Sequence, residues 1–299
     1  LGGADIQVNL RADAEAVVSG NTVANNDISY TGRDYYDTAA IFFLFTSGTT
    51  VEHNTIRHVP WTGIATGWGW GLLDEGGFPG MPYAQKDEWG VFTTPTVTRN
   101  NRIASNRISH FLEQLWDGGA VYINGSQGWS PDDGLVLALN VADGKRPEAG
   151  SNVFYTDAGT RYVTMDRNVS MTNPVGIVDF GSCATPSTWE FSRSAELLIR
   201  RFGDTELTRW LIAILDSIAG GLCSVTDLKV SYGADFGGCV PRGHLTYTDN
   251  YFAQPIHFFD ICTEHLSVPV AIPDVSIHNI AIQSESDVPA WILDQAGKR

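Results

Sequence analysis

Residues 101–110 read Asn101-Arg-Ile-Ala-Ser-Asn106-Arg-Ile-Ser-His110, and this stretch decides the fold. It repeats an earlier one, Asn21-Thr-Val-Ala-Asn-Asn26-Asp-Ile-Ser-Tyr30, with Asn, Ala, Asn, Ile and Ser in the same places. The offset persists, because Asp37-Thr-Ala-Ala-Ile-Phe-Phe43 falls on Asp117-Gly-Gly-Ala-Val-Tyr-Ile123. A single repeat unit of this kind cannot bury its apolar face alone, so the repeats predict a chain that winds in stacked coils.

Further copies extend the pattern, with Val51-Glu-His-Asn54-Thr-Ile56 between the first two and Val163-Thr-Met-Asp-Arg-Asn168-Val169 after them. Asn at such bends satisfies backbone groups and stacks on its counterparts, so we expect Asn21, Asn26 and Asn54 to be structural. The sequence predicts an all-β fold, a parallel β-helix solenoid with long loops, one of them a polar insertion at residues 125–150.

We expect one domain over residues 1–299, with regular coils in 1–180 and less regular coils in 181–299. The later part includes a helical segment near residues 194–218 and a short terminal helix at 288–297. The chain opens in strand-like sequence without a capping helix, and a bare solenoid end exposes strand edges. We therefore expect an N-terminal fragment or a partner chain to complete the β-helix.

Composition narrows the function classes. The net charge of −15 argues against nucleic acid and anionic membranes as partners, and no apolar run is long enough to span a bilayer. The four cysteines contain no Cys-x-x-Cys pair, which argues against a zinc site. Their even number predicts two disulfides in a secreted, extracellular protein, with Cys223–Cys239 the preferred one of three possible pairings. Buried free thiols are the alternative. The four are Cys183, Cys223, Cys239 and Cys262.

An aromatic stretch precedes a long loop. Trp68 and Trp70 stand among glycines and are followed by the acidic pair Asp74 and Glu75. Exposed tryptophan rings suit the flat C–H faces of sugars, so these four residues are candidate carbohydrate-binding groups. The alternatives are an apolar plug under the loop and a solvated acidic tip.

Two carboxylates carry the candidate chemistry. Asp117 and Asp157 both stand at strand–turn junctions, and stacked coils lie about 4.8 Å apart. Carboxylates on neighbouring coils would fall within the range used for glycoside hydrolysis, with one held protonated as the acid. Gly118, Gly119 and Gly159 would let a sugar ring approach the backbone. Each Asp taken singly is equally well explained as a turn residue.

Polar and aromatic side chains around these carboxylates are candidate substrate-binding groups. His110 and His58 follow equivalent strands and suit sugar hydroxyls, although a lone His is more often structural. No nucleotide-binding or phosphate-binding glycine motif is present, so no cofactor is expected. The candidates in this region are His110, Trp116, Tyr122, Tyr155 and Arg161.

These motifs, in order, resemble the right-handed parallel β-helix proteins of the pectate-lyase-like superfamily, and within it the glycoside hydrolase family 141-like group. The resemblance implies hydrolysis of glycosidic bonds in complex polysaccharides, with Asp117 and Asp157 as the acid/base and the nucleophile or base. It also implies an acidic residue after Asp157, where this chain has Ala158. The matching stretches are Trp61-Thr-Gly-Ile-Ala-Thr-Gly-Trp-Gly-Trp-Gly71, Asn101-Arg-Ile-Ala-Ser-Asn-Arg-Ile108, Asp117-Gly-Gly-Ala-Val-Tyr122 and Tyr155-Thr-Asp-Ala-Gly-Thr-Arg-Tyr-Val163.

Two other readings remain. A polysaccharide lyase on the same fold would use Arg161 as the base, with Ca²⁺ held by the acidic cluster. A non-catalytic carbohydrate-binding solenoid would need only the aromatic walls. The acidic chain favours hydrolysis over the lyase, because uronate polymers are anionic. Fold alone cannot choose among the three.

Overall fold

The structure is a computed structural model that describes residues 17–68, 96–146, 153–157, 160–171, 205, 207, 243–253 and 275–299. The four cysteines, Trp70, Asp74 and Glu75 lie outside these residues, as does the predicted helical segment at 194–218 apart from Thr205 and Leu207. The disulfide prediction and these candidate residues therefore stay predictions.

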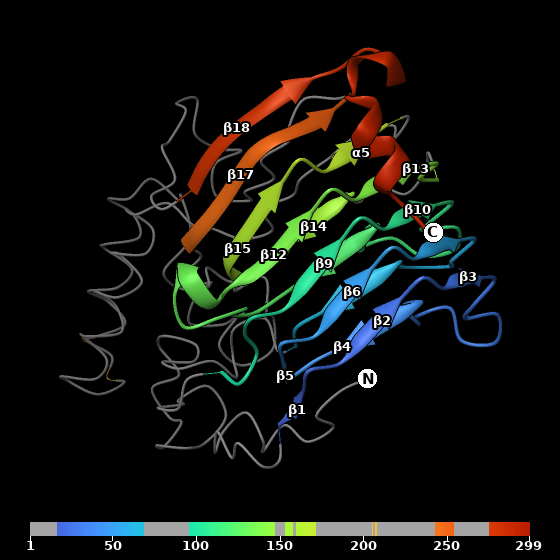
Figure 1. The fold of residues 1–299 in the computed structure, drawn as a ribbon. Helices are drawn as coiled ribbons and strands as arrows, with labels where there is room; N and C mark the ends of the chain where they lie inside the picture. The colour runs from blue at the N-terminus through green and yellow to red at the C-terminus, as the bar shows by residue number, and fades with distance from the viewer. Residues whose placement is uncertain are drawn as a thin grey trace.

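The described elements are almost all strands, and they stack in chain order from β2 to β18 (Figure 1). All strand pairings found among the described residues are parallel. This confirms the predicted all-β parallel solenoid. The elements are β1 (Val18–Ser19), β2 (Thr22–Ala24), β3 (Asp27–Ser29), β4 (Ile41–Phe43), β5 (Thr46–Ser47), β6 (Thr50–Glu52), β7 (Thr55–Arg57), β8 (Ile64–Thr66), β9 (Arg102–Ala104), β10 (Arg107–Ser109), β11 (Val121–Ile123), the 3-10 helix η2 (Pro131–Asp133), β12 (Leu135–Ala138), β13 (Val141–Asp143), β14 (Phe154–Thr156), β15 (Arg161–Asp166), β16 (Val169–Ser170), β17 (Gly243–Phe252), β18 (Val275–Ala281), the 3-10 helix η3 (Glu285–Asp287) and α5 (Ala290–Gln295).

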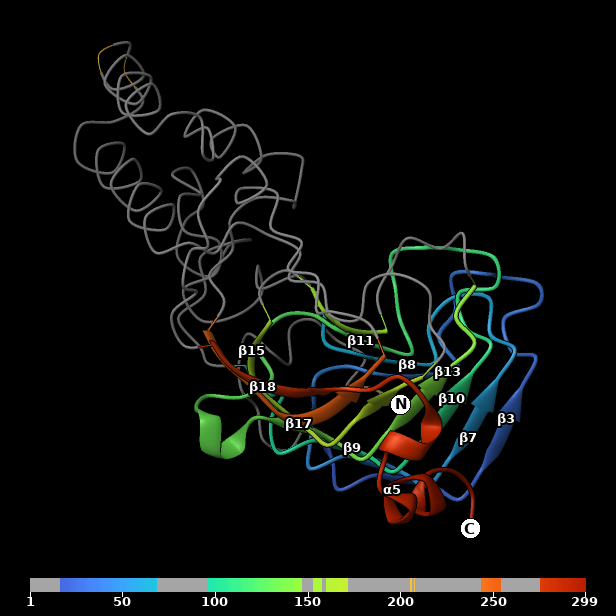
Figure 2. The same cartoon turned by 90° about the horizontal axis from the view of Figure 1, so that it is seen from above.

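Each coil has three sides. The 12-stranded sheet forms two of them, one containing β2, β6, β9, β12 and β15 and the other β3, β7, β10, β13 and β16, and β17 runs along both. A four-stranded sheet, in the order β14-β11-β8-β4, forms the third side. Figure 2 shows β8 and β11 on a different side of the coils from β9 and β17.

Like residues stack on like in the interior. Val51 lies in register with Ile103, Ile103 with Leu137, and Leu137 with Met165. On the next side Ile56 lies in register with Ile108. These side chains are all fully buried in one apolar cluster. Because neighbouring strands keep this register, a short inward row of apolar residues per coil becomes a continuous core along the stack.

The prediction of a polar insertion at residues 125–150 is wrong. This stretch contains η2, β12 and β13 and forms a coil of its own. That coil lies between the coil of β9 and β10 and the coil of β15 and β16. The apolar run Leu135-Val-Leu-Ala138 explains the strand, since Leu135 and Leu137 face the core. The glycines and aspartates around it had masked this pattern. β11 pairs directly with β14, so Asp117 and Asp157 belong to adjacent coils.

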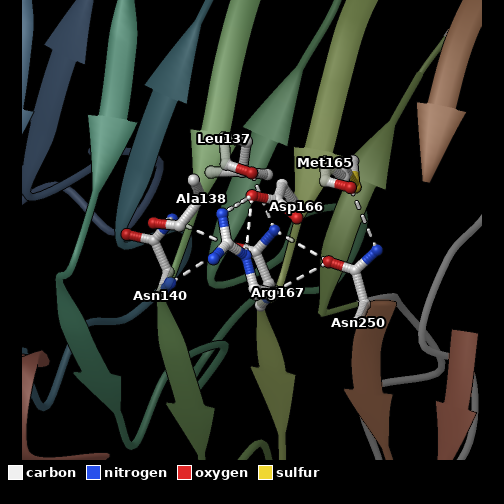
Figure 3. A network of polar contacts seen from close by, with 8 residues as sticks. Leu137, Ala138, Asn140, Met165, Asp166, Arg167 and Asn250 are labelled. Carbon is white, nitrogen blue, oxygen red and sulfur yellow. Dashed lines mark hydrogen bonds and ion pairs between the residues drawn. The ribbon is translucent and has the colours of Figure 1, made fainter. Parts of the chain in front are cut away.

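Asparagines form a continuous hydrogen-bonded column at one corner. In each step the backbone N–H and the side-chain Nδ2 of one Asn both donate to Oδ1 of the Asn in the next coil, at 2.9–3.1 Å. Figure 3 shows the part of the column from Asn140 to Asn250. The column consists of Asn26, Asn54, Asn106, Asn140, Asn168 and Asn250.

The residue before each column Asn makes the bend. All six have a positive φ between 51° and 60°, which turns the chain between two sides of the coil. Sequence analysis assigned a structural role to Asn26 and Asn54, and the column explains it. The left-handed conformation belongs to the residues before the column asparagines and not to the asparagines themselves. The six are Asn25, His53, Ser105, Leu139, Arg167 and Asp249.

The C-terminal segment packs on the outside of the 12-stranded sheet. An outward row that is polar in the early coils becomes apolar at Val141 and Val169, and α5 buries both in a second cluster through Ile292. Beyond the helix, the backbone N–H of Gly297 donates to Ser105 O and that of Arg299 to Asn25 Oδ1. The predicted terminal helix is thus present, and its tail crosses several coils (Figure 2).

Candidate active site

The outer face of the four-stranded sheet carries a row of mostly aromatic side chains. Phe42, Ala65, Tyr122 and Tyr155 are the middle residues of β4, β8, β11 and β14, and they lie in register. Their strand neighbours on both sides are all buried, most of them in the apolar core, so these four point outwards. Tyr122 and Tyr155 are nevertheless only 7% and 6% exposed. The row is therefore covered at Ala65, Tyr122 and Tyr155, whereas Phe42 at its other end is exposed.

Asp157 comes from the end of β14. It stands two residues after Tyr155, so the two side chains share the outer face. Its backbone N–H donates to Ile123 O at 2.8 Å, and its carbonyl accepts from the backbone N–H and the hydroxyl of Thr160. The residue is 8% exposed. These contacts hold Asp157 rigidly against the neighbouring coil.

Asp117 comes from the loop before β11. Its backbone has φ 57°, and its carbonyl accepts from the indole Nε1 of Trp61 at 3.0 Å. A Cβ on the next residue, Gly118, would meet Trp61 Nε1 and Thr62 Oγ1, both at 2.5 Å. Gly118 is thus required by the packing of the coil underneath. This supplies a structural reason for the glycine that sequence analysis had linked to sugar approach.

The two carboxylates meet around one tyrosine hydroxyl. Tyr155 Oη lies 3.2 Å from Asp117 Oδ1 and 3.1 Å from Asp157 Oδ1. The hydroxyl of Tyr122 donates to the other oxygen, Asp157 Oδ2, at 2.5 Å. The structure therefore brings four of the predicted site residues together in one cluster built by β11, β14 and the loop before β11.

The surroundings of Asp117 shift the pKa of its carboxyl. Burial raises the pKa of the Asp117 carboxyl, the neighbouring Asp157 charge adds to the rise, and the hydrogen bond from Tyr155 opposes it. Asp117 is exposed as a residue, but its carboxyl end lies against Tyr155. A raised pKa is what a carboxylic acid needs in order to remain protonated and act as a general acid.

Exposed aromatic rings belong to the coil of Asp117 and to the coils before it. Trp116, next to Asp117 in the chain, is 71% exposed. Trp68 is 40% exposed and its ring centroid lies 6.3 Å from that of Phe42. Phe42 and Trp68 belong to the coils of β4 and β8, which lie two strands and one strand before β11 in the sheet. The rings are thus distributed along the stack of coils on the side of the carboxylates.

Two predicted site residues have other contacts. The His110 ring stacks on His58 with centroids 4.5 Å apart, and His58 stacks in turn on Tyr30 at 4.6 Å. All three have a positive φ, so they form a corner column that accounts for His110 structurally. Arg161 opens β15 in the 12-stranded sheet, where its carbonyl accepts from Gln127 N.

Sequence analysis did not include Trp61 and Thr62 among the site residues. Trp61 hydrogen-bonds the Asp117 backbone, and its ring lies 5.5 Å from that of Tyr122. Thr62 Oγ1 accepts from Gly119 N at 3.3 Å. The repeat offered a signal for both, because Pro60-Trp-Thr occupies the turn before β8 that corresponds to Asp117-Gly-Gly before β11.

The described residues contain no cluster of metal ligands and no helix that could span a membrane. Among them, no group of three or more His, Cys, Asp or Glu side chains is close enough to hold a metal ion. None of their helices has the length and apolar character needed to cross a bilayer. Asp74 and Glu75 are outside this part of the chain, so the calcium site of the lyase reading is untested.

Comparison with known proteins gives one distant similarity. No protein-family model and no curated protein sequence matches the chain. A solved structure described as a glycoside hydrolase is similar, with a TM-score of 0.43 and 22% sequence identity. The match covers 56% of this chain and 24% of that one, so this chain spans about a quarter of that enzyme. A likeness this distant carries no argument about activity, which has to come from the site itself.

Proposed function

We propose that this protein is a glycoside hydrolase that cleaves glycosidic bonds in an oligosaccharide or polysaccharide through Asp117 and Asp157. The observation that carries the proposal is the Tyr155 hydroxyl, which lies within hydrogen-bond distance of both carboxylates. Two carboxylates of unlike environment on one surface are the catalytic requirement for this reaction. The exposed aromatic rings beside them supply surfaces for sugar binding.

The roles follow from the environments of the two acids. Asp117, whose pKa is raised, is the general acid that protonates the glycosidic oxygen. Asp157 accepts hydrogen bonds on both oxygens, and a carboxylate that accepts on both oxygens suits the ionised form. Asp157 is therefore the nucleophile or base.

The spacing favours retention of anomeric configuration. Asp117 Oδ1 and Asp157 Oδ1 both contact Tyr155 Oη, at 3.2 Å and 3.1 Å. The distance between these two carboxylate oxygens therefore cannot exceed the sum of the two contacts. This upper limit lies just below the roughly 6.5–9.5 Å between carboxyl groups of inverting enzymes, so it favours the closer spacing of retaining enzymes, roughly 5–5.5 Å. Little room is left for a water molecule between Asp157 and the sugar, so Asp157 acts as the nucleophile.

The test is incubation with a panel of neutral and acidic glycans, with and without chelator, followed by product mass and proton NMR of fresh products. We expect products heavier by one water, unaffected by chelator, with the anomeric configuration of the substrate. Unsaturated products without added water would replace hydrolysis by the lyase reaction. Binding without any product would favour a non-catalytic solenoid, and inverted products would contradict the nucleophilic role of Asp157.

Replacing Trp116 by Ala should weaken substrate binding more than chemistry. The ring is exposed beside Asp117, so its loss removes stacking area without altering the carboxylate contacts. We expect KM to rise about 10-fold while kcat changes less. The reason is that about 1–2 kcal/mol of binding energy is lost equally from the substrate complex and from the transition state. Trp291→Ala is the matched control, because this half-exposed ring lies on α5 outside the 12-stranded sheet. Equal KM values for Trp116→Ala and the unaltered protein would remove Trp116 from the binding surface.

A further inference from the structure

The position of Tyr155 between the carboxylates has a mechanistic consequence. Its hydroxyl oxygen is nearly equidistant from Asp117 Oδ1 and Asp157 Oδ1, at 3.2 and 3.1 Å. A phenol carries one proton, so at any moment it can donate to one of the two. A shared donor of this kind stabilises whichever carboxylate is charged.

The rings that carry the two hydroxyls are fixed. Tyr122 and Tyr155 lie in register on paired strands, with ring centroids 5.1 Å apart in an edge-to-face arrangement. Trp61 packs on Tyr122 from the coil underneath. The middle positions of short strands and the low exposure of both rings restrict their rotamers. The hydroxyls can rotate their protons, while their oxygen atoms stay in place.

We propose that Tyr155 is a positioning residue whose hydrogen bond follows the negative charge, from Asp157 in the resting enzyme to Asp117 once Asp117 has given up its proton. This inference rests on the proposed glycosidase activity and adds a role for a residue that does not itself react. Tyr122 differs, because its hydroxyl donates to the far oxygen of Asp157.

Protons, bonds and charge balance in both steps of the proposed reaction. In the first, the Asp117 proton passes to the glycosidic oxygen, the bond from C1 to that oxygen breaks, and an Asp157 oxygen bonds to C1. Asp157 is then a neutral ester and Asp117 is charged, so the Tyr155 proton turns to Asp117. In the second step water attacks C1, its proton passes to Asp117, the ester bond breaks, and the hydrogen bond returns to Asp157. The sum is glycoside plus water giving two products.

The hydrogen bond between Tyr155 and Asp117 can be detected in the titration of Asp117. The titratable groups that the described residues place against it are Asp157 and Tyr155. The Tyr155 hydrogen bond favours the charged form of Asp117 and so lowers its pKa. Tyr155→Phe removes that effect, leaves burial and the Asp157 charge in place, and raises the pKa of Asp117. The acid then remains protonated to higher pH.

The experiment compares Tyr155→Phe with Tyr122→Phe, which lose the same atom from neighbouring rings. Carboxyl carbon NMR with ¹³C-labelled Asp, assigned through Asp117→Asn, follows Asp117 without any substrate. We expect a higher Asp117 pKa in Tyr155→Phe and a smaller change in Tyr122→Phe. On a substrate found with the glycan panel, kcat/KM should fall about 10- to 100-fold in Tyr155→Phe, with its alkaline limb moved to higher pH.

Unchanged Asp117 titration in Tyr155→Phe would overturn the shared hydrogen bond, whatever the activity. If the unaltered protein hydrolyses no glycan, the proposed function fails, while the NMR result still decides the hydrogen bond. If Tyr155→Phe does not fold, the Cζ resonance of Tyr155 in the unaltered protein replaces it, identified by through-bond assignment, while Tyr122→Phe identifies the Tyr122 resonance. That resonance should move through the Asp117 titration more than the Tyr122 resonance does, and equal movement would contradict the proposal.

Discussion

Replacing Asp157 by Asn should reduce kcat by about 10⁴-fold or more while the protein stays folded. The amide has the size of the carboxylate and keeps acceptor capacity for one tyrosine hydroxyl, but it cannot form the bond to C1 that the proposed first step requires. The measurement is kcat at saturating substrate, with circular dichroism to confirm the fold.

The repeat supplies a matched control for this variant. Asp37 precedes β4 as Asp117 precedes β11, and it is exposed. Asp37→Asn changes an equivalent turn carboxylate away from the Tyr155 cluster and should leave kcat unchanged. Asp117→Asn should cost about 10²–10⁴-fold, with a smaller loss on substrates whose leaving group needs no proton. A kcat for Asp157→Asn equal to that of Asp37→Asn would contradict the assignment.

Replacing Asn106 by Ala should destabilise the protein by about 3 kcal/mol or more. Asn106 is fully buried in the middle of the column, where its Oδ1 accepts from Asn54 N and Nδ2. Its Nδ2 donates to Val51 O, Ala104 O and Asn140 Oδ1. The Ala variant would leave the Asn54 backbone N–H and the Val51 carbonyl without these partners inside the core, which costs more than the loss of exposed hydrogen bonds.

The urea midpoint, with an unchanged slope, measures this loss. Asn26→Ala is the control, because Asn26 has the same role in the first described coil but is exposed. Its Nδ2 bonds to Ala24 O and Asn54 Oδ1 are near solvent, so we expect a loss within about 1 kcal/mol. Equal losses for the two variants would contradict a stabilising role of the buried column.

The repeat made the fold predictable, and its irregular spacing limited the detail. Successive column asparagines are 28, 52, 34, 28 and 82 residues apart. Asn54 and Asn106 stand in similar local sequence and were recognisable. Asn140 follows a different strand, Leu135-Val-Leu-Ala138, among glycines and aspartates, so its coil was interpreted as a loop. Coil stacking determines where in a turn each column asparagine lies. The number of residues between two turns varies from coil to coil, so it cannot be predicted from the repeat.

The carboxylate pair was predictable for the same reason, and its partners were not. Coil stacking predicted that Asp117 and Asp157 lie close together, but their turns are not equivalent, because Asp117 precedes β11 whereas Asp157 follows β14. Strand periodicity put Tyr122 and Tyr155 on one face but did not tell which atom their hydroxyls reach. The bond from Trp61 to the Asp117 carbonyl joins residues 56 apart and depends on the positive φ at Asp117. Contacts of this kind depend on exact backbone geometry, which no residue pattern in a single chain encodes.

Trapping the covalent intermediate would identify the nucleophile itself. A 2-deoxy-2-fluoro glycoside of the sugar identified by the glycan panel, with a good leaving group, slows release of the glycosyl group from the enzyme. We expect one glycosyl adduct per chain, located by peptide mass on Asp157 and absent in Asp157→Asn. An adduct on another residue, or turnover with inversion and no adduct, would contradict the assignment of Asp157 as the nucleophile and Asp117 as the acid.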